Sequence, residues 1–200
     1  MTDKPTPEAR RQAILEAAIR VFAQHGFDAA TTDDIARAAG LSKGGLYWHF
    51  KSKDDILAAI LIQLFDQELS VLQGLLVAEG AVAPRLRQLV AQGVAAVLQL
   101  EQLLPVMLEF YALAARKSDV RQFLQQYYQR YHQLLTKLFE QGFARGEFHR
   151  GTAEAAALTL IAQLEGVGLL WAIVPELVRL ADQSESALAL LLRGLMAADT

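Results

Sequence analysis

The stretch from Thr31 to Lys53, TTDDIARAAGLSKGGLYWHFKSK, decides the fold of the N-terminal quarter of this chain. Thr31 and Asp34 have the spacing of a capping box, in which each side chain hydrogen-bonds to the backbone of the other residue. The pattern therefore predicts a helix from Thr32. Gly40 ends this helix, because a residue without a Cβ readily takes the left-handed conformation found at helix ends.

A second short helix follows the turn. Ser42 is a favourable N-cap for a helix from Lys43 to about Phe50. Ser52 and Asp55 then repeat the capping-box spacing, which predicts a long helix that begins at Lys53. Two short helices joined by a Gly-containing turn are typical of the helix-turn-helix motif, whose second helix enters the major groove of DNA.

The composition of this second helix favours contact with nucleic acid. The pair Gly44–Gly45 weakens the helix but lets its backbone approach another surface closely. Tyr47, Trp48 and His49 spread over the face that the core-facing side chains leave. Residues 38–53 contain three lysines and no acid, although the whole chain has a net charge of −3, and such a local basic patch indicates phosphate binding. A solvated helical hairpin would explain the lysines but not the exposed aromatic side chains.

The N-terminal quarter resembles the DNA-binding domain of TetR-family transcriptional regulators. The similarity runs from about Arg10 to Leu57 and rests on the residues ILEAAIRVFAQHGFDAATTDDIARAAGLSKGGLYWHFKSKDDIL. Its most specific part is the run LYWHF, Leu46 to Phe50, followed by Lys53. The rest of the chain is similar to the family in length and all-helical character. The resemblance implies a bacterial DNA-binding regulator.

The resemblance also implies roles for individual residues. It implies phosphate contacts from Thr32, Tyr47, His49 and Lys53, and base-edge positions for Lys43, Gly44, Gly45 and Trp48. Because glycines offer no side-chain hydrogen bonds, direct readout falls mostly to Lys43, which suits guanine O6 and N7, and DNA shape carries part of the recognition. Asp33 can accept a hydrogen bond from a cytosine amine, but we favour a simpler role as a negative charge at a helix N-terminus.

Composition limits the other possible classes. Two hundred residues suffice for one domain or two small ones. Cysteine is absent, so neither a disulfide framework nor a thiolate metal site is expected. The N-terminus MTDKPTPEARR lacks the apolar segment of a secretory signal. Glu154, Glu165 and Glu176 interrupt the longest candidate for a membrane span, which needs roughly 18 uncharged apolar residues. We therefore expect a soluble, cytoplasmic protein.

The pattern beyond residue 52 predicts six more helices and no strand. Apolar residues recur at helical spacing, and alternation at period two is absent. We predict an all-α protein with a three-helix, helix-turn-helix DNA-binding domain over residues 1–52 and a larger helical domain for effector binding and dimerisation over residues 53–200. The first helix should run from Pro7 to about His25. The helices of the larger domain should cover residues 53–78, 84–100, 105–117, 119–144, 152–173 and 185–198.

The last two predicted helices are too apolar for the surface of a monomer. A helix that is apolar nearly all round is buried on more than one side, by a second copy of the chain or by a larger intramolecular core. The resemblance favours the second copy, because TetR regulators pair through their last two helices as a four-helix bundle. Such a dimer presents two reading helices roughly 34–36 Å apart and needs a near-palindromic operator. The expected interface residues are Leu158, Ile161, Glu165, Leu169, Leu191 and Leu195.

Large aromatic and apolar side chains gather in the middle helices. They suit a pocket for a small apolar or amphipathic effector, although an ordinary core explains most of them equally well. Glu109 or Glu165 would favour a cationic or hydrogen-bond-donating ligand, but pairing with an arginine such as Arg116 or Arg130 is the role we prefer. The resemblance implies that the effector changes the spacing of the reading helices. The candidate pocket residues are Met107, Glu109, Phe110, Tyr111, Phe123, Tyr127, Tyr131 and Trp171.

Enzymatic and metal chemistry find little support in the sequence. It has no Gly-rich phosphate loop after a strand, no G-x-S-x-G and no H-E-x-x-H, and we expect no cofactor. His132, His149 and Glu147 form a weak candidate for a metal site, with surface histidines as the simpler interpretation. Three hypotheses result: a dimeric, ligand-responsive repressor, a helical carrier or sensor that no longer reads DNA, and a hydrolase whose turnover depends on Glu109.

Overall fold

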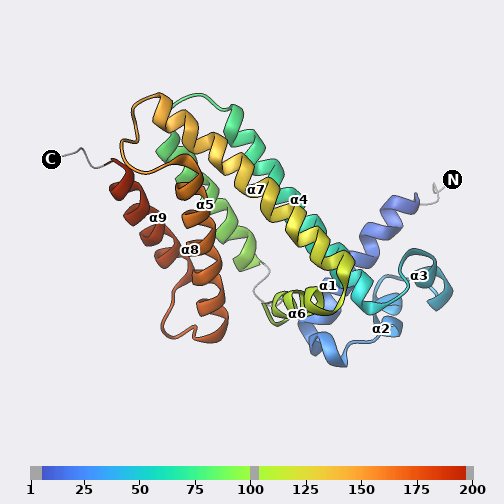
Figure 1. Ribbon diagram of the computed structural model, residues 1–200. Helices are drawn as coiled ribbons and strands as arrows, with labels where there is room; N and C mark the ends of the chain where they lie inside the picture. The colour runs from blue at the N-terminus through green and yellow to red at the C-terminus, as the bar shows by residue number, and fades with distance from the viewer. Residues whose placement is uncertain (1–5, 100–103, 197–200) are drawn as a thin grey trace. The chain divides into compact units, whose positions relative to one another are not determined.

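The computed structural model describes residues 6–99 and 104–196, except for the side chains of residues 104–107 and 109. Within these residues the chain forms nine helices and no strand, which confirms the predicted all-α class (Figure 1). The helices are α1 (Pro7–Ala29), α2 (Thr32–Ala38), α3 (Lys43–His49), α4 (Lys53–Val77), α5 (Val82–Gln99), α6 (Leu104–Arg116), α7 (Ser118–Ala144), α8 (Ala153–Ile173) and α9 (Leu180–Met196).

The helices form two compact units. The first comprises Met1–Phe65 and Glu101–Gln122, and the second comprises Asp66–Leu100 and Phe123–Thr200. The first half of α4 therefore belongs to one unit and its second half to the other. This division of the packing differs from the functional boundary expected between residues 52 and 53, and that boundary stays a prediction.

In the first unit, the helix-turn-helix segment formed by α2 and α3 packs against α1. This helix begins at Pro7, where the hydroxyl of Thr6 accepts a hydrogen bond from the Ala9 amide at 3.2 Å. Its helical geometry breaks at Gly26, as expected, because φ there is 74° and suits glycine. α2 packs against both α1 and α3. The largest fully buried side chains of this unit include Ile14, Phe22, Ile35, Leu46, Ile56 and Leu57.

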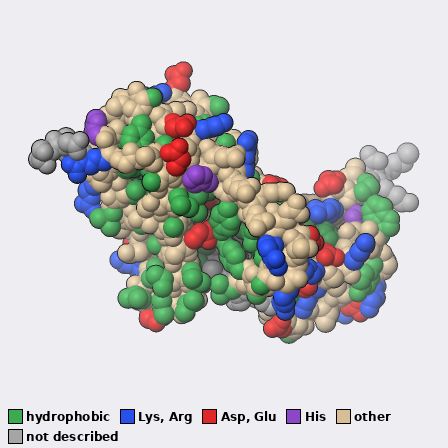
Figure 2. All heavy atoms as spheres, viewed as in Figure 1, with side chains coloured by type: hydrophobic (Ala, Val, Ile, Leu, Met, Phe, Trp, Pro, Cys, Tyr) green, Lys and Arg blue, Asp and Glu red, His purple; other side chains and the backbone are tan. Residues whose placement is uncertain are grey.

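The second unit is built around α5, α7, α8 and α9. α9 packs against both α5 and α8, and α7 lies beside the second half of α4 (Figure 1). α8 is long and apolar enough to cross a membrane by length and composition alone. Much of its apolar surface is uncovered, since Leu158 and Ile173 are each 61% exposed. Figure 2 shows hydrophobic side chains gathered at the surface where α8 ends and the chain turns toward α9.

Arg85 ties the start of α5 to the end of α4. This guanidinium is buried, and it donates to four backbone carbonyls, those of Leu75, Ala78, Gly80 and Ala81, at 2.9–3.2 Å. It also donates to the side-chain carbonyl of Gln141 on α7 at 2.9 Å. Each of the three guanidinium nitrogens thus donates to at least one acceptor, and such hydrogen bonds are what allow a buried charge to remain stable.

α9 begins at Leu180, about five residues earlier than the sequence pattern indicated. The sequence pattern placed the start of this helix at residue 185, within the polar run over residues 182–186, and that start was wrong. Four of the five side chains in this run lie on the exposed face of the helix, while Ser184 is buried. Arg179 and Asp182 form an exposed ion pair at 2.8 Å across the first turn, so a short polar run here marks the solvent face of a helix.

Candidate nucleic-acid interface

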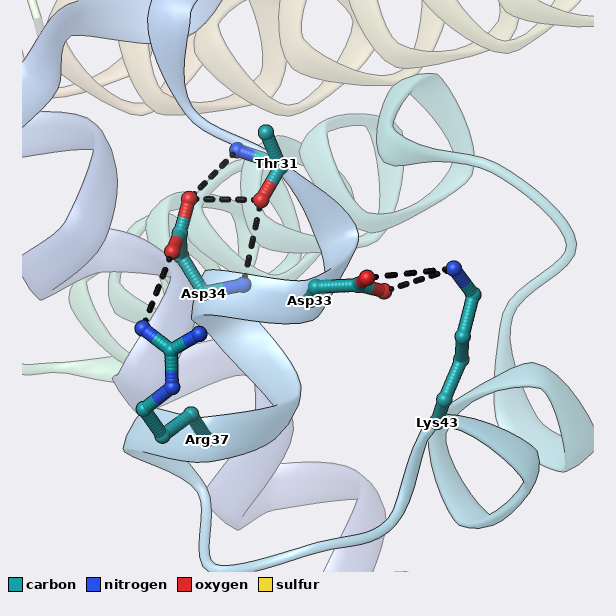
Figure 3. Close-up of polar contacts among 5 residues, drawn as sticks. All are labelled: Thr31, Asp33, Asp34, Arg37 and Lys43. Atoms are coloured by element: carbon teal, nitrogen blue, oxygen red, sulfur yellow. Dashed lines mark hydrogen bonds and ion pairs between the residues drawn. The ribbon is translucent and has the colours of Figure 1, made fainter.

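The helix-turn-helix begins with the predicted capping box. The hydroxyl of Thr31 accepts from the Asp34 amide at 3.1 Å, and the Asp34 carboxylate accepts from the Thr31 amide at 3.3 Å (Figure 3). The Thr31 hydroxyl also donates to this carboxylate at 2.5 Å. These hydrogen bonds lower the pKa of Asp34, with a further contribution from Arg37. The capping box therefore fixes where α2 starts and which way its first turn points.

The reading helix α3 presents its aromatic residues to solvent. It begins where the Ser42 hydroxyl accepts from the Gly45 amide at 3.1 Å. Leu46 is fully buried beneath it, whereas Trp48 is 72% exposed and Tyr47 is 42% exposed. Large aromatic side chains with this exposure contribute little to folding, and two of them side by side leave an apolar surface that another molecule can cover.

Two of the residues expected at phosphates lie next to each other. The Thr32 hydroxyl on α2 and the Tyr47 hydroxyl on α3 are 3.2 Å apart. Both residues remain accessible to solvent. The packing of α2 on α3 thus places two neutral hydrogen-bonding groups at one point of the exposed surface.

Lys43 forms an ion pair that the sequence analysis did not anticipate. Its ammonium lies 2.9 Å from Oδ1 and 3.1 Å from Oδ2 of Asp33, which is in the first turn of α2 (Figure 3). The hydrogen bond and the charge of Asp33 raise the pKa of Lys43. The two residues are ten positions apart, so only the turn between α2 and α3 brings them together. Asp33 thus has a specific partner in addition to its favourable place at a helix N-terminus.

Gly44 and Gly45 leave the start of α3 without large side chains. A Cβ added at Gly44 would have no heavy atom within 4 Å, and one added at Gly45 would lie 3.4 Å from the Ser42 hydroxyl oxygen. Gly44 is therefore not required by packing inside the chain. Its small size fits a surface that another molecule approaches closely.

Lys53 is held by the chain itself. Its ammonium donates to the carbonyls of Asp28 and Ala30 at 3.0 Å each, and to the carbonyl of Phe27. It also lies 4.5 Å from the centre of the Phe27 ring, within the range of a cation–π interaction. The three N–H groups are thus engaged at the C-terminal end of α1, an arrangement that the spacing of 23–26 residues does not reveal.

The residues expected to line an effector pocket are divided between the two units. Phe110 is buried in the first unit, where its ring centre is 6.1 Å from that of Phe65, and Tyr111 is partly exposed there. Phe123 and Trp171 are half-buried in the second unit. The Met107 and Glu109 side chains lie outside the described residues. Two surface hollows of about 330 and 180 Å³ lie between α5 and α9 and are lined by other residues.

The buried residues Tyr127 and Tyr131 belong to a polar network around the half-buried Glu68. The Tyr127 hydroxyl donates to Oε2 of Glu68 at 2.7 Å, and Tyr131 hydrogen-bonds to the same carboxyl. Burial raises the pKa of Glu68 above its usual value, and the pKa of both tyrosines is also raised. On the neighbouring face of α7, Tyr128 donates to Glu165 at 2.8 Å. The sequence pattern of α4 does not reveal Glu68 as a site residue, because nothing in it marks this carboxyl as the partner of two tyrosines on α7.

The residues expected at a dimer interface do not all face outward. Leu158, Leu169 and Glu165 are exposed, and Ile161 and Leu191 are half-buried. Leu195 is 6% exposed within the single chain, so its side chain has little surface to offer a partner. Other apolar side chains on this part of the surface are also exposed and stand outside the set of expected interface residues, namely Leu170, Ile173, Leu177, Leu190 and Met196.

The three residues of the weak metal candidate have separate roles. Oε2 of Glu147 accepts from the Val82 amide at 2.7 Å and so caps α5. The His149 amide donates to the Leu195 carbonyl at 2.8 Å, and Nε2 of His132 lies 3.3 Å from the Glu154 carbonyl oxygen. Within the part of the chain that the structure describes, no group of three histidine or acidic residues is arranged to hold a metal ion.

Known protein families and individual relatives match this chain in sequence. The family described as "Bacterial regulatory proteins, tetR family" matches residues 14–60, and the family "BetI-type transcriptional repressor, C-terminal" matches residues 82–197. The uncharacterized HTH-type transcriptional regulator YfiR of Bacillus subtilis is 31% identical over 154 residues, which cover 74% of each chain. The uncharacterized HTH-type transcriptional regulator TtgW of Pseudomonas putida is 46% identical over 63 residues, 30% of this chain and 47% of TtgW.

Solved structures agree with the sequence matches. The structure of SmeT, the repressor of the multidrug efflux pump SmeDEF of Stenotrophomonas maltophilia, superposes with a TM-score of 0.75 at 24% identity, covering 94% of this chain and 90% of SmeT. The match to TtgW spans less than half of that relative, but the two family matches together cover most of this sequence. The chain belongs to the TetR family of bacterial transcriptional regulators, which are DNA-binding proteins rather than enzymes.

Proposed function

We propose that this protein is a homodimeric repressor that binds a near-palindromic operator and leaves it when a small molecule binds. The observation that carries the proposal is the exposed face of α3, where Tyr47 and Trp48 stand in solvent beside Lys43. The hydroxyl of Thr32, at the adjoining start of α2, lies 3.2 Å from that of Tyr47 on α3, and this supports the proposal that both groups contact a phosphate. A helix of this size, with aromatic and basic side chains outward, fits the major groove.

Dimerisation is supported by the uncovered apolar side chains of α8 and α9. Leu158, Ile173 and Leu190 are each about 60% exposed, and a patch this apolar is unfavourable in water unless another surface covers it. A second copy related by a two-fold axis would bury the same patch on both chains. It would also present two α3 helices to successive major grooves, which is why the operator should be a near-palindrome.

The polar network in the second unit supports the proposal that a small-molecule effector binds. Tyr127 and Tyr131 are buried, and the half-buried carboxyl of Glu68 accepts hydrogen bonds from both phenols; a few polar groups placed in this way give a ligand site its specificity. The SmeT–triclosan complex, with a TM-score of 0.79 at 24% identity, shows that a protein of this fold holds a small molecule. For release to occur, the effector must bind the DNA-free arrangement more tightly than the DNA-bound one.

Selection of bound fragments from genomic DNA tests the proposal. The protein should retain a small set of duplexes that share a near-palindromic sequence, and retention should weaken as salt rises. A compound library screened for release of the selected operator would then identify the effector. A protein that binds small molecules but retains no duplex even at low ionic strength would instead be a helical sensor without DNA-binding activity.

A further inference from the structure

Asp33 and Lys43 form a pair of opposite charges across the two helices of the DNA-binding motif. The ammonium of Lys43 contacts both carboxylate oxygens of Asp33, at 2.9 and 3.1 Å. Figure 3 shows the lysine side chain reaching from the start of α3 to the start of α2. Both side chains are more than half exposed, at 63% for Lys43 and 52% for Asp33. The pair therefore stands on the surface that faces DNA in the proposed function.

The ion pair with Asp33 weakens the attraction of Lys43 to DNA that contains no specific site. Gly44 and Gly45 carry no side chains, so Lys43 supplies the positive charge in the first turn of α3. Asp33 neutralises that charge at short range. A phosphate that attracts Lys43 must displace Asp33 from it, and it also repels the Asp33 carboxylate. Because an exposed ion pair is weak, a favourable DNA contact can still rearrange it.

The edge of one base pair is complementary to this arrangement. In the major groove, guanine presents O6 and N7 as acceptors and its partner cytosine presents the N4 amine as a donor. O6 and N4 are hydrogen-bonded to each other, so they lie roughly 2.9 Å apart. Nζ of Lys43 and Oδ1 of Asp33 are also 2.9 Å apart. Lys43 is a donor, which matches the guanine acceptor O6, and Asp33 is an acceptor, which matches the cytosine donor N4.

We propose that Asp33 and Lys43 act as one recognition unit that reads a single G·C pair in each half-site. Lys43 donates to guanine O6 and N7 while Asp33 accepts from cytosine N4. Asp33 is then a specificity-determining residue: where the cytosine amine is missing, its carboxylate is left facing the groove without a donor, and binding there is penalised. This inference rests on the proposed function as an operator-binding protein.

Four proteins and one set of duplexes test the unit. The operator retained by the wild type is changed one base pair at a time, and binding is measured for the wild type, Asp33→Asn, Lys43→Gln and the double variant. Asp33→Asn and Lys43→Gln should lose discrimination at the same G·C pair, and the double variant should lose no more at that position than either single variant. Asp33→Asn should also bind an unrelated duplex about threefold to tenfold more tightly.

Asp66→Asn is the matched control, because it removes one exposed negative charge from α4, in the other compact unit. It should leave discrimination intact and change binding to the unrelated duplex far less than Asp33→Asn does. Thermal unfolding of all variants separates a loss of helix stability from a loss of readout.

Three results would overturn the unit while leaving operator binding intact. The first is that Asp33→Asn and Lys43→Gln affect different base pairs. The second is that their losses of discrimination at one base pair add fully in the double variant. The third is that Asp66→Asn binds the unrelated duplex as much more tightly as Asp33→Asn does. Failure of the wild type to retain any duplex is distinct from these results, since it would refute operator binding itself and the recognition unit with it.

Discussion

The hydroxyl groups of Thr32 and Tyr47 lie 3.2 Å apart, although the two residues are separated by 15 positions in the chain. One belongs to the first turn of α2 and the other to the exposed face of α3. Their contact holds the two helices of the motif in register, and it points two hydrogen-bonding groups toward the same region of solvent. A phosphate placed there would meet both groups at once.

Replacing Tyr47 with Phe should weaken DNA binding without altering sequence preference. The substitution removes a hydroxyl but keeps the ring, and one neutral hydrogen bond contributes about 0.5–1.5 kcal/mol. Affinity for specific and unrelated duplexes should fall by the same factor, roughly threefold to tenfold. Fluorescence anisotropy on both duplexes measures the effect. A loss confined to the operator would mean that Tyr47 reads bases rather than the backbone.

Replacing Lys53 with Met should destabilise the first unit. The change removes three hydrogen bonds from a charged donor to the end of α1, and we expect a loss of about 1–3 kcal/mol of unfolding free energy in denaturant titration. Lys51→Met is the control, because Lys51 is exposed on the same part of the chain. Salt titration separates a second role: if Lys53 also contacts a phosphate, the salt slope of DNA binding falls by about one.

Replacing Arg85 with Met should destabilise the second unit by about 3–5 kcal/mol. Methionine fills a similar volume but leaves the carbonyls of Leu75, Ala78 and Ala81 and the Gln141 side chain without their Arg85 donor, while the Gly80 carbonyl still accepts from Arg145. Arg87→Met, an exposed position on the same helix, should change the unfolding free energy by less than about 0.5 kcal/mol. Equal stability of the two variants would show that water replaces the guanidinium at little cost.

Replacing Glu68 with Gln should change how stability depends on pH. The pKa of Glu68 is raised in the folded chain by burial, so the folded state holds this proton more firmly than the unfolded state does. Unfolding free energy therefore falls as pH rises from the ordinary value of 4.5 through the raised pKa. A glutamine side chain does not titrate, so the Glu68→Gln variant should lose this dependence and gain stability relative to the wild type toward neutral pH.

Chemical denaturation of both proteins at several pH values measures this difference, with Asp66→Asn as the control for an exposed acid on the same helix. Tyr127 and Tyr131 remain able to donate to the glutamine carbonyl, so the network keeps its hydrogen bonds. If the difference in unfolding free energy between variant and wild type stays constant with pH, burial does not raise the pKa of Glu68 as described.

Replacing Leu169 with Asp should yield a monomer with very weak operator affinity. Leu169 is 49% exposed on α8, so the change should disturb folding of the single chain little while placing a charge in the proposed interface. Val77→Asp, at a residue 82% exposed on α4, controls for the added charge and should remain dimeric. Light scattering gives the mass in solution, and an intact Leu169→Asp dimer would refute the proposed interface.

Local signals determined much of the DNA-binding part of this protein. Thr31 and Asp34 fix the start of α2, Ser42 fixes the start of α3, and Gly40 closes the turn between them, because caps and left-handed residues act within four positions of themselves. Apolar residues at helical spacing predicted the all-helical class, and the resemblance over residues 10–57 indicated the family. The sequence pattern failed at the start of α9, where a polar run is equally compatible with a loop and with the solvent face of a helix.

Tertiary structure alone decided the partners of three charged side chains. Lys43 meets Asp33, Lys53 meets the end of α1, and Glu68 meets Tyr127, at separations of 10 to 59 residues. A sequence read at helical spacing shows which face a residue occupies but not which helix lies opposite that face. Electrostatic contacts depend on that opposing face. The sequence therefore determined where this protein places a basic, aromatic helix, while only the packing of its helices decided which of those charges are already engaged and which can meet another molecule.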